Sequence, residues 1–282
     1  MASIAKSGPC ILLTGASKGI GLATLRLLLE VPKSLKYPST EAPPSIVTVS
    51  RSIPDELQQL ASQYGDRVEL VQGDVTSQEV NAKAVRRAEE KYGRLDALIL
   101  NAGVLGMGKQ GEVAPETFAE VINVNLVSLH STIQAALPLL RKSPSGLGKV
   151  VLVSSGAAVS AVAGWGAYCV SKAGAVTLGK ILAIEEKDLA VWSVRPGVVD
   201  TYMQSQIRSD GAAHMEESTR KRFIDSHSGG KLLPAHAPAH VLCTLALRGT
   251  RQEPRTAEGA GAGAEGAFIS WDSEELKDWR AE

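Results

Sequence analysis

Tyr168 and Lys172 are the residues whose types and spacing most directly suggest chemistry. They stand four positions apart in a stretch with helical periodicity, so both side chains are expected on one helix face. A phenol ordinarily titrates at about 10 and a lysine ammonium at about 10.4. Because an ammonium stabilises a phenolate, we expect it to lower the pKa of Tyr168. Such a tyrosine can protonate a carbonyl oxygen while hydride reaches the carbon, or catalyse the reverse reaction.

Ser155 is a second polar residue in a position suited to catalysis. It follows the β-branched run at 149–153, which is typical of a buried strand. Ligands of open α/β sheets bind beyond the carboxyl ends of the strands. A serine hydroxyl there can hold a carbonyl and stabilise developing negative charge. The alternative role, a strand-end cap, fits the neighbouring Ser154 better.

A glycine-rich turn follows the first apolar run and leads into an amphipathic stretch. Glycines at a strand-to-helix turn let the backbone approach a pyrophosphate, and the helix N-terminus behind them offers free N–H groups. An ordinary tight turn is the alternative, but the placement after the first strand of a βαβ pattern favours a dinucleotide site. The residues expected to contact the cofactor there are Gly15, Ser17, Lys18, Gly19, Ile20 and Gly21.

The end of the second apolar run bears on the choice of cofactor. A carboxylate at this place usually binds the ribose 2′-hydroxyl of NAD. Here the run ends in Ser50 and Arg51, with no acid. Arg51 could pair with a 2′-phosphate, and Lys18 could reach the same group. Together they favour NADP(H) over NAD(H).

These residues need a scaffold, and short apolar runs alternating with amphipathic ones predict a parallel sheet covered by helices. We expect one doubly wound Rossmann domain over residues 1–282, an α/β fold with about seven parallel strands and helices on both faces. The strands are expected at 10–14, 46–50, 68–72, 95–100, 149–153, 191–194 and 267–271. The helices are expected at 20–30, 55–64, 78–92, 115–141, 165–187 and 239–247.

Two segments carry no clear periodicity. Residues 199–233 are polar and irregular, and we expect the segment 199–234 to form a lid over the substrate. The Gly/Ala tract at 259–266 predicts a flexible loop.

Composition narrows the class of partner. Thirty basic and thirty acidic residues cancel, which argues against nucleic acid and anionic membranes and for a small-molecule partner. Three widely separated cysteines fit a reducing compartment, and a cytoplasmic protein with no membrane contact is expected. His236 and His240 share a helical spacing, but Pro238 lies between them and a third ligand is lacking nearby, so no metal site is expected.

The motifs together resemble the short-chain dehydrogenase/reductase family in its single-domain branch. The resemblance covers essentially the whole chain, with the motifs in the family's order and spacing. They are Thr14-Gly15-x-x-x-Gly19-x-Gly21, Asn101-Ala102-Gly103, Ser155, Tyr168-x-x-x-Lys172 and Pro196-Gly197-x-x-x-Thr201.

The resemblance implies further roles. Asn101, Ala102 and Gly103 would brace the sheet and flank the cofactor, and Asp74, beside Val75, would contact the adenine. Asn125 would complete a catalytic set with Ser155, Tyr168 and Lys172 by holding a water that links the lysine to solvent. Lys172, beside Tyr168, would also hold the nicotinamide ribose. The nicotinamide side would be lined by Pro196, Gly197, Val199 and Thr201.

Within the family, the run Trp165–Tyr168, Arg51 and the Val199–Thr201 segment look like fungal benzil reductases and sepiapterin reductases. Those enzymes reduce one carbonyl of a vicinal dicarbonyl. An acid in the last strand anchors the pterin in sepiapterin reductases, but Ser270 aligns there, with Asp272 two residues on, which argues against a pterin. The family also implies a homodimer or homotetramer through the helices at 115–141 and 165–187, although some relatives are monomers.

The sequence therefore predicts an NADPH-dependent reductase that acts on a carbonyl substrate, a ketone or a vicinal diketone. One alternative keeps the fold and makes the protein an NAD-dependent alcohol dehydrogenase, which Arg51 argues against. Another is a non-enzymatic binding or regulatory protein on the same scaffold. Such proteins typically lose the tyrosine or the lysine, and both are present here.

Overall fold

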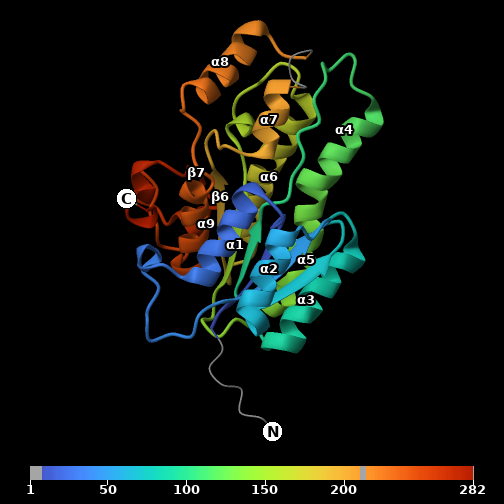
Figure 1. Cartoon of the computed structure of the whole chain (residues 1–282). Helices are drawn as coiled ribbons and strands as arrows, with labels where there is room; N and C mark the ends of the chain where they lie inside the picture. Colours follow the sequence, from blue (N-terminus) through green and yellow to red (C-terminus); the bar gives the residue numbers. More distant parts are fainter. Residues whose placement is uncertain (1–7, 210–213, 282) are drawn as a thin grey trace.

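A seven-stranded parallel sheet forms the centre of the computed structural model, which describes residues 8–209 and 214–281 (Figure 1). Its spatial order is β3-β2-β1-β4-β5-β6-β7, that of a doubly wound Rossmann sheet as the sequence predicted. The strands are β1 Cys10–Thr14, β2 Ser45–Ser50, β3 Val68–Gln72, β4 Ala97–Leu100, β5 Gly148–Val153, β6 Leu189–Arg195 and β7 Phe268–Ser270.

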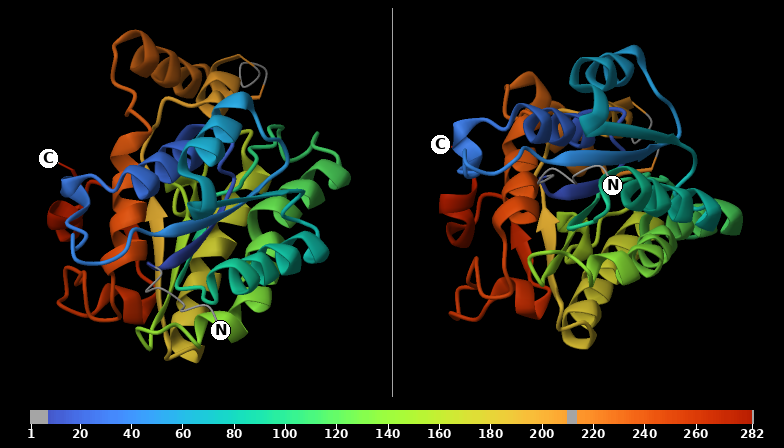
Figure 2. Two further views of the ribbon diagram at one scale, coloured as in Figure 1. Left: turned by 60° about the horizontal axis from the view of Figure 1, so that its bottom comes forward. Right: turned by 90° about the horizontal axis from the view of Figure 1, so that it is seen from below.

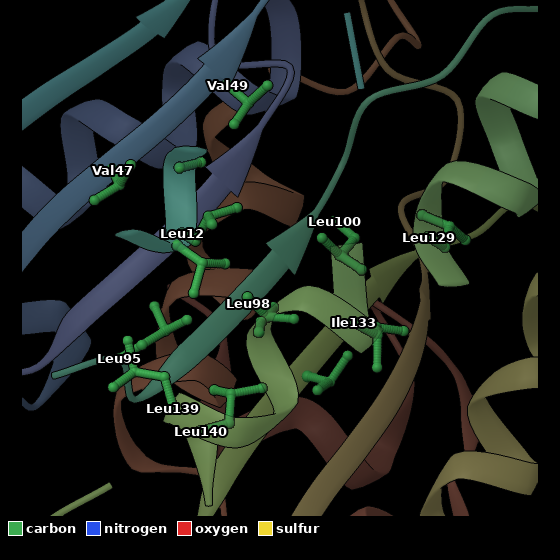
Figure 3. Packing of buried hydrophobic residues seen from close by; sticks show 14 of the residues in the cluster. Leu12, Val47, Val49, Leu95, Leu98, Leu100, Leu129, Ile133, Leu139 and Leu140 are labelled. Atoms are coloured by element: carbon green, nitrogen blue, oxygen red, sulfur yellow. The ribbon is translucent and has the colours of Figure 1, made fainter. Parts of the chain in front are cut away.

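Helices cover both faces of the sheet (Figure 2). Side chains alternate along a strand, so Leu12 of β1 faces one helical layer while Ile11 and Leu13 face the other. One layer holds α1 Gly19–Glu30, α2 Asp55–Tyr64 and α9 His236–Arg248. The other holds α3 Gln78–Tyr92, α5 Ser128–Leu140 and α6 Gly166–Glu185. Figure 3 shows the second core, where Leu98 and Leu100 of β4 pack with Leu129 and Ile133 of α5.

The strand order reverses between β1 and β4, both of which pair in parallel with the neighbouring strands. In sheets of this kind the crevice for a ligand lies at the carboxyl ends of the strands beside that reversal. The glycine turn follows β1, Asn101 follows β4, and Ser154 and Ser155 follow β5. The topology therefore brings these distant segments to one edge of the sheet.

The long helix predicted at 115–141 is divided into three parts. Its first part is α4 Pro115–Ile122, and α5 is its last, with a π-helical segment at Asn123–Val127 between them. Helical periodicity continues through this stretch, so the sequence pattern does not reveal the change of winding. Such π segments occur often at functional sites, and Asn125 lies in this one.

Two predictions about irregular segments were wrong. The described part of the segment 199–233 contains the helices α7 Tyr202–Ser209 and α8 Glu217–Ser228, which lie above the carboxyl ends of the strands in Figure 1. The Gly/Ala tract contains α10 Ala262–Glu265, and Ala262 is fully buried. Glycine and alanine form a close-packed turn here because only small residues fit beside Trp192 of β6.

Among the described residues, α6 is long and apolar enough to cross a membrane by length and composition. Half of its apolar window is buried inside the fold, as expected for a helix that packs on a sheet in a core.

The close packing of α10 can be tested by adding one methyl group. A Cβ on Gly263 would meet the carbonyl oxygen of Thr250 and lie 2.8 Å from Cζ2 of Trp192. We expect Gly263→Ala to lower the free energy of unfolding by about 1–3 kcal/mol, measured by urea denaturation. Gly111→Ala, at a position with nothing within 4 Å, is the matched control and should change stability by less than about 0.5 kcal/mol. Equal stability of the two variants would mean that the tract is a loose loop.

Candidate active site

Helix α6 carries Tyr168 and Lys172 one turn apart, as predicted. Both side chains are almost completely buried, and the Lys172 Nζ lies 5.7 Å from the centre of the Tyr168 ring. The Lys172 ammonium donates a 2.8 Å hydrogen bond to the carbonyl oxygen of Val153, the last residue of β5. This bond fixes the lysine between the helix and the strand end.

Ser155 lies two residues beyond β5 and begins a short 3-10 turn at Gly156–Ala158. Its Oγ accepts a 3.2 Å hydrogen bond from the Ala157 amide, so Ser155, and not Ser154, caps this turn. The Ser155 side chain lies close enough to the Tyr168 phenol to influence its pKa. Serine and tyrosine hydroxyls thus meet at one place, where a carbonyl oxygen could accept from both.

Burial controls the ionisation of this pair. Desolvation raises the pKa of Tyr168 to about 12, while the nearby Ser155 side chain acts in the opposite direction. Desolvation also lowers the pKa of Lys172 to about 8. The expected lowering of the tyrosine pKa was therefore wrong for this structure, because the loss of water outweighs any benefit from a nearby ammonium. At neutral pH the phenol holds its proton.

Asn125 is fully buried and faces the same site from the π-helical segment. Its Oδ1 accepts a hydrogen bond from the Val104 amide, and its Nδ2 donates to the Val104 carbonyl and to Ser171 Oγ. Ser171 in turn donates to the carbonyl of Tyr168. The Asn125 side chain therefore has protein partners that connect the loop after β4 to α6. Whether Asn125 also holds a water beside Lys172 stays a prediction.

The glycine turn is shaped for close backbone contact. A Cβ on Gly21 would collide with the Gly15 carbonyl and lie 2.6 Å from Asn101 Nδ2, while Gly15 and Gly19 have positive φ angles. Within the described residues, no side chain caps α1, whose first turn has no acidic residue. Its free N–H groups and the dipole of a twelve-residue helix fit a pyrophosphate. Ser17 lies in the glycine turn, and Ile20 lies in the first turn of α1.

Asn101 and Thr14 tie the glycine turn to β4. Asn101 Nδ2 donates to the carbonyls of Thr14 and Gly15, and Thr14 Oγ1 accepts from the amides of Asn101 and Ala102. Gly103 lies next, and a Cβ there would be 3.2 Å from Asn125 Oδ1 and 3.7 Å from Lys172 Nζ. This segment therefore joins the phosphate turn to the catalytic residues.

The residues expected at the adenosine end lie together beyond β2 and β3. Ser50 is buried and its Oγ accepts from the Ala16 amide, so it supports the glycine turn. Arg51 is exposed and close enough to Asp74 to help lower the pKa of that carboxyl, although hydrogen bonds from Thr76 contribute more. Asp74 is followed by the buried Val75.

Lys18 is an exposed residue of the glycine turn between β1 and α1. Its Nζ is 3.8 Å from the centre of the Tyr202 ring at the start of α7, a cation–π distance. The lysine therefore contacts the lid.

The segment after β6 forms the other wall of the crevice. Gly197 has a φ of +79°, and a Cβ there would lie 2.6 Å from Leu233 Cδ1. Leu233 also holds this segment by two backbone hydrogen bonds, to the Val198 carbonyl and from the Asp200 amide. Thr201 Cγ2 would be 3.2 Å from a Cβ on Gly19, so this wall reaches the phosphate turn. Pro196 and Val199 lie within the same segment.

An apolar group that we call the Tyr168 cluster covers the Tyr168 phenol. It joins the lid helices to α6 and to the loops after β4 and β5, and its buried members are Leu105, Ala157, Trp165, Tyr168, Ile207, Met215 and Phe223. Trp165 meets the Tyr168 ring edge-on at 5.8 Å and stacks on Phe223 at 5.6 Å. A substrate that reaches Tyr168 must displace some of these side chains.

Sequence comparisons agree with this architecture. Residues 9–212 match the family model described as short chain dehydrogenase. An uncharacterised oxidoreductase of Schizosaccharomyces pombe is 38% identical over 265 residues, covering 93% of this chain and 96% of the relative. The chain belongs to the short-chain dehydrogenase/reductase family. Members of this family use nicotinamide cofactors, NAD or NADP, and the chain is thus an oxidoreductase.

The chain is also similar to several yeast proteins. The benzil reductase ((S)-benzoin forming) of Saccharomyces cerevisiae is 35% identical over 251 residues, covering 86% of this chain and 91% of the relative. A crystal structure of a short-chain dehydrogenase/reductase from the same yeast has a TM-score of 0.84 and 33% identity, covering 97% of this chain and all of that one. A second yeast structure, described as a cytoplasmic protein with unknown function, has a TM-score of 0.73 and 31% identity, with coverage of 97% and 100%.

Sequence reasoning overlooked several residues that hold the site. Ser171 links Asn125 to the backbone of α6, and Trp165 and Phe223 cover the catalytic tyrosine. Ser171 stands directly before Lys172, so its place beside the motif was the available signal. Phe223 offered a weaker signal, as one of the few large apolar residues in a polar stretch.

The buried state of Lys172 predicts a pH dependence of stability. The folded protein releases this proton near pH 8, whereas the unfolded chain holds it to about 10.5, so the unfolded state binds more protons in between. We therefore expect the free energy of unfolding of the wild type, relative to Lys172→Met, to rise between these pH values by on the order of 3 kcal/mol. Urea denaturation of the cofactor-free proteins measures this, and parallel pH profiles would contradict a desolvated lysine.

Proposed function

We propose that the protein is an NADPH-dependent carbonyl reductase that converts a ketone, or one carbonyl of a vicinal diketone, to an alcohol. The observation that carries this proposal is the buried, protonated Tyr168 hydroxyl beside Ser155. Burial raises the pKa of this phenol to about 12, so it carries the proton that a carbonyl oxygen would receive.

The residues fit a dinucleotide, whose pyrophosphate would rest on the backbone of Gly15–Gly21. Lys172 would hold the nicotinamide ribose, and Val199 and Thr201 would line the nicotinamide. When bound, the cofactor supplies a hydride to the carbonyl carbon. Ser155 orients the carbonyl oxygen, and Tyr168 transfers its hydroxyl proton to that oxygen. The proton lost from Tyr168 is restored from solvent through the groups around Lys172.

Arg51 and Lys18 support NADPH as the cofactor, because β2 ends in Ser50 and Arg51 with no acid of its own, and both cations could pair with a 2′-phosphate. The similarity to a benzil reductase supports a diketone. Three free cysteines and the similarity to a protein described as cytoplasmic support a cytoplasmic location.

We also propose that two or four copies associate through α5 and α6. Exposed apolar side chains support this, because Val170, Ile181 and Ile184 form a stripe along α6. Val127, just before α5, is half exposed as well.

The acid role of Tyr168 is tested by Tyr168→Phe, which removes the hydroxyl and keeps the ring. We expect kcat with benzil and NADPH to fall by about 10²–10⁴-fold, while the Kd for NADPH stays within about threefold. Absorbance of NADPH and fluorescence titration measure the two quantities. Tyr64→Phe on α2 is the matched control, and retained turnover in Tyr168→Phe would refute the role.

The choice of cofactor is tested by Arg51→Ala. Loss of a charge-assisted bond to the 2′-phosphate should raise the Kd for NADPH about tenfold and leave the Kd for NADH nearly unchanged. Lys83→Ala, at an exposed position of α3, is the control. Equal wild-type affinities for NADPH and NADH would instead support the NAD-dependent alternative.

A further inference from the structure

The lid covers Tyr168 with a surface that is apolar except for a few polar atoms. Trp165 is 7% exposed and Gln204 of α7 is 3% exposed. Among the described residues, neither the Trp165 indole N–H nor either polar atom of the Gln204 amide has a hydrogen-bond partner. A buried polar group left without a partner costs about 1–3 kcal/mol, so these atoms need an explanation.

Their location provides one. Trp165 contacts the Tyr168 ring directly and belongs to the Tyr168 cluster. Gln204 lies three residues before Ile207, a member of the same cluster, so the two share a face of α7. The Trp192 indole N–H is unpartnered too, but Trp192 lies in the sheet core with β6 and α9. Contact with Tyr168 therefore distinguishes Trp165 from Trp192, and Gln204 lies on the face of α7 that carries Ile207 into the Tyr168 cluster.

The lid is also closely seated on this place. A Cβ on Gly164, next to Trp165, would lie 2.5 Å from the His214 carbonyl oxygen, and Phe223 of α8 stacks on the Trp165 indole. A carbonyl compound that reaches the Tyr168 hydroxyl must enter between these elements. Its body then meets aromatic and aliphatic side chains, and its remaining polar atoms meet Trp165 and Gln204.

We propose that the Trp165 indole N–H and the Gln204 carboxamide bind the second oxygen of an aromatic or apolar vicinal dicarbonyl, and so select this class over simple ketones. The proposal rests on the carbonyl reductase function proposed above. The first oxygen belongs to Ser155 and Tyr168, and the second is carried by the adjacent carbon. Both anchors are neutral and can hydrogen-bond a neutral carbonyl oxygen. Among the described residues, Arg208, His214 and Arg220 of the same segment also have buried nitrogens without a partner, so a carboxylate is the competing ligand that the test includes.

The physical basis of the selection is an asymmetry. A dicarbonyl satisfies donors that are otherwise left unpaired, whereas a monoketone of the same shape leaves them buried and unpaired. Sites built to hydrogen-bond a substrate group reject the analogue that lacks it far more strongly than an apolar pocket rejects a missing methylene. Trp165 and Gln204 therefore change the relative kcat/KM of the two substrates and take no part in the transfer of hydride or proton.

The test compares benzil with deoxybenzoin, in which one carbonyl of benzil is replaced by a methylene. We expect Gln204→Met and Trp165→Phe each to lower the ratio of kcat/KM for benzil to that for deoxybenzoin by about tenfold, because each removes a hydrogen bond that only benzil can make. Intrinsic differences in reactivity cancel because the same ratio is compared between variants. Gln206→Met, the same change on the same helix, should leave the ratio unaltered.

A second measurement needs no turnover. In the Tyr168→Phe background with NADPH bound, calorimetry should show the Kd for benzil rising about tenfold on Gln204→Met, and the Kd for deoxybenzoin staying constant. The binding measurement is valid even where a variant turns over slowly. Melting temperatures identify any variant that fails to fold, and the test then relies on the other variant.

Several results would overturn the proposal. One is an unchanged ratio in both variants, and another is an equal loss for both ketones with weaker NADPH binding, which would make Gln204 a cofactor contact. A wild-type preference for phenylglyoxylate over benzil would contradict a neutral second oxygen. Reduction of deoxybenzoin but not benzil by the wild type refutes this proposal alone, whereas no oxidation of NADPH with any carbonyl refutes the proposed function itself.

Discussion

The hydrogen bond from Lys172 to the Val153 carbonyl is the contact on which the arrangement of the site depends. It joins the middle of the core helix α6 to the carboxyl end of a central strand, and both of its ends are shielded from water. Tyr168, one turn earlier on α6, is thereby fixed relative to Ser155, which follows the same strand. Asn125 and Ser171 extend this connection to the loop after β4. These side chains are thus held by elements of the core, and α7 and α8 only cover them.

Burial raises the pKa of Tyr168 and lowers the pKa of Lys172. It keeps the tyrosine protonated and makes the lysine easier to deprotonate, and both changes disfavour charge where water is excluded. A bound cofactor and a polarised carbonyl bring new charge into this surrounding, where electrostatic interactions are stronger than in water. The covered site is therefore consistent with an acid that gives up its proton only as negative charge develops on the substrate oxygen.

Much of the fold was predictable because local patterns agreed with the tertiary structure. The bounds of β1, β3, α2 and α3 match the predicted ranges, since turn residues and a change of periodicity mark their ends. The π-helical segment was not predictable, because the winding around Asn125 depends on contacts with Val104 and Ser171 from other elements. The lid helices were missed because α8 buries little besides Phe223 and so shows no apolar face. In the site, the positions of Tyr168 and Lys172 followed from their spacing, but their ionisation depends on desolvation by residues distant in sequence.

The central claim is that hydride and proton are delivered to one carbonyl at the buried tyrosine. The most direct measurement is a single turnover of benzil with NADPH that carries deuterium at the transferring position, followed by mass spectrometry of the product. We predict benzoin with one deuterium on the carbinol carbon and unlabelled hydrogen on the oxygen. Unreacted benzil, or benzoin without deuterium on that carbon, would contradict the account.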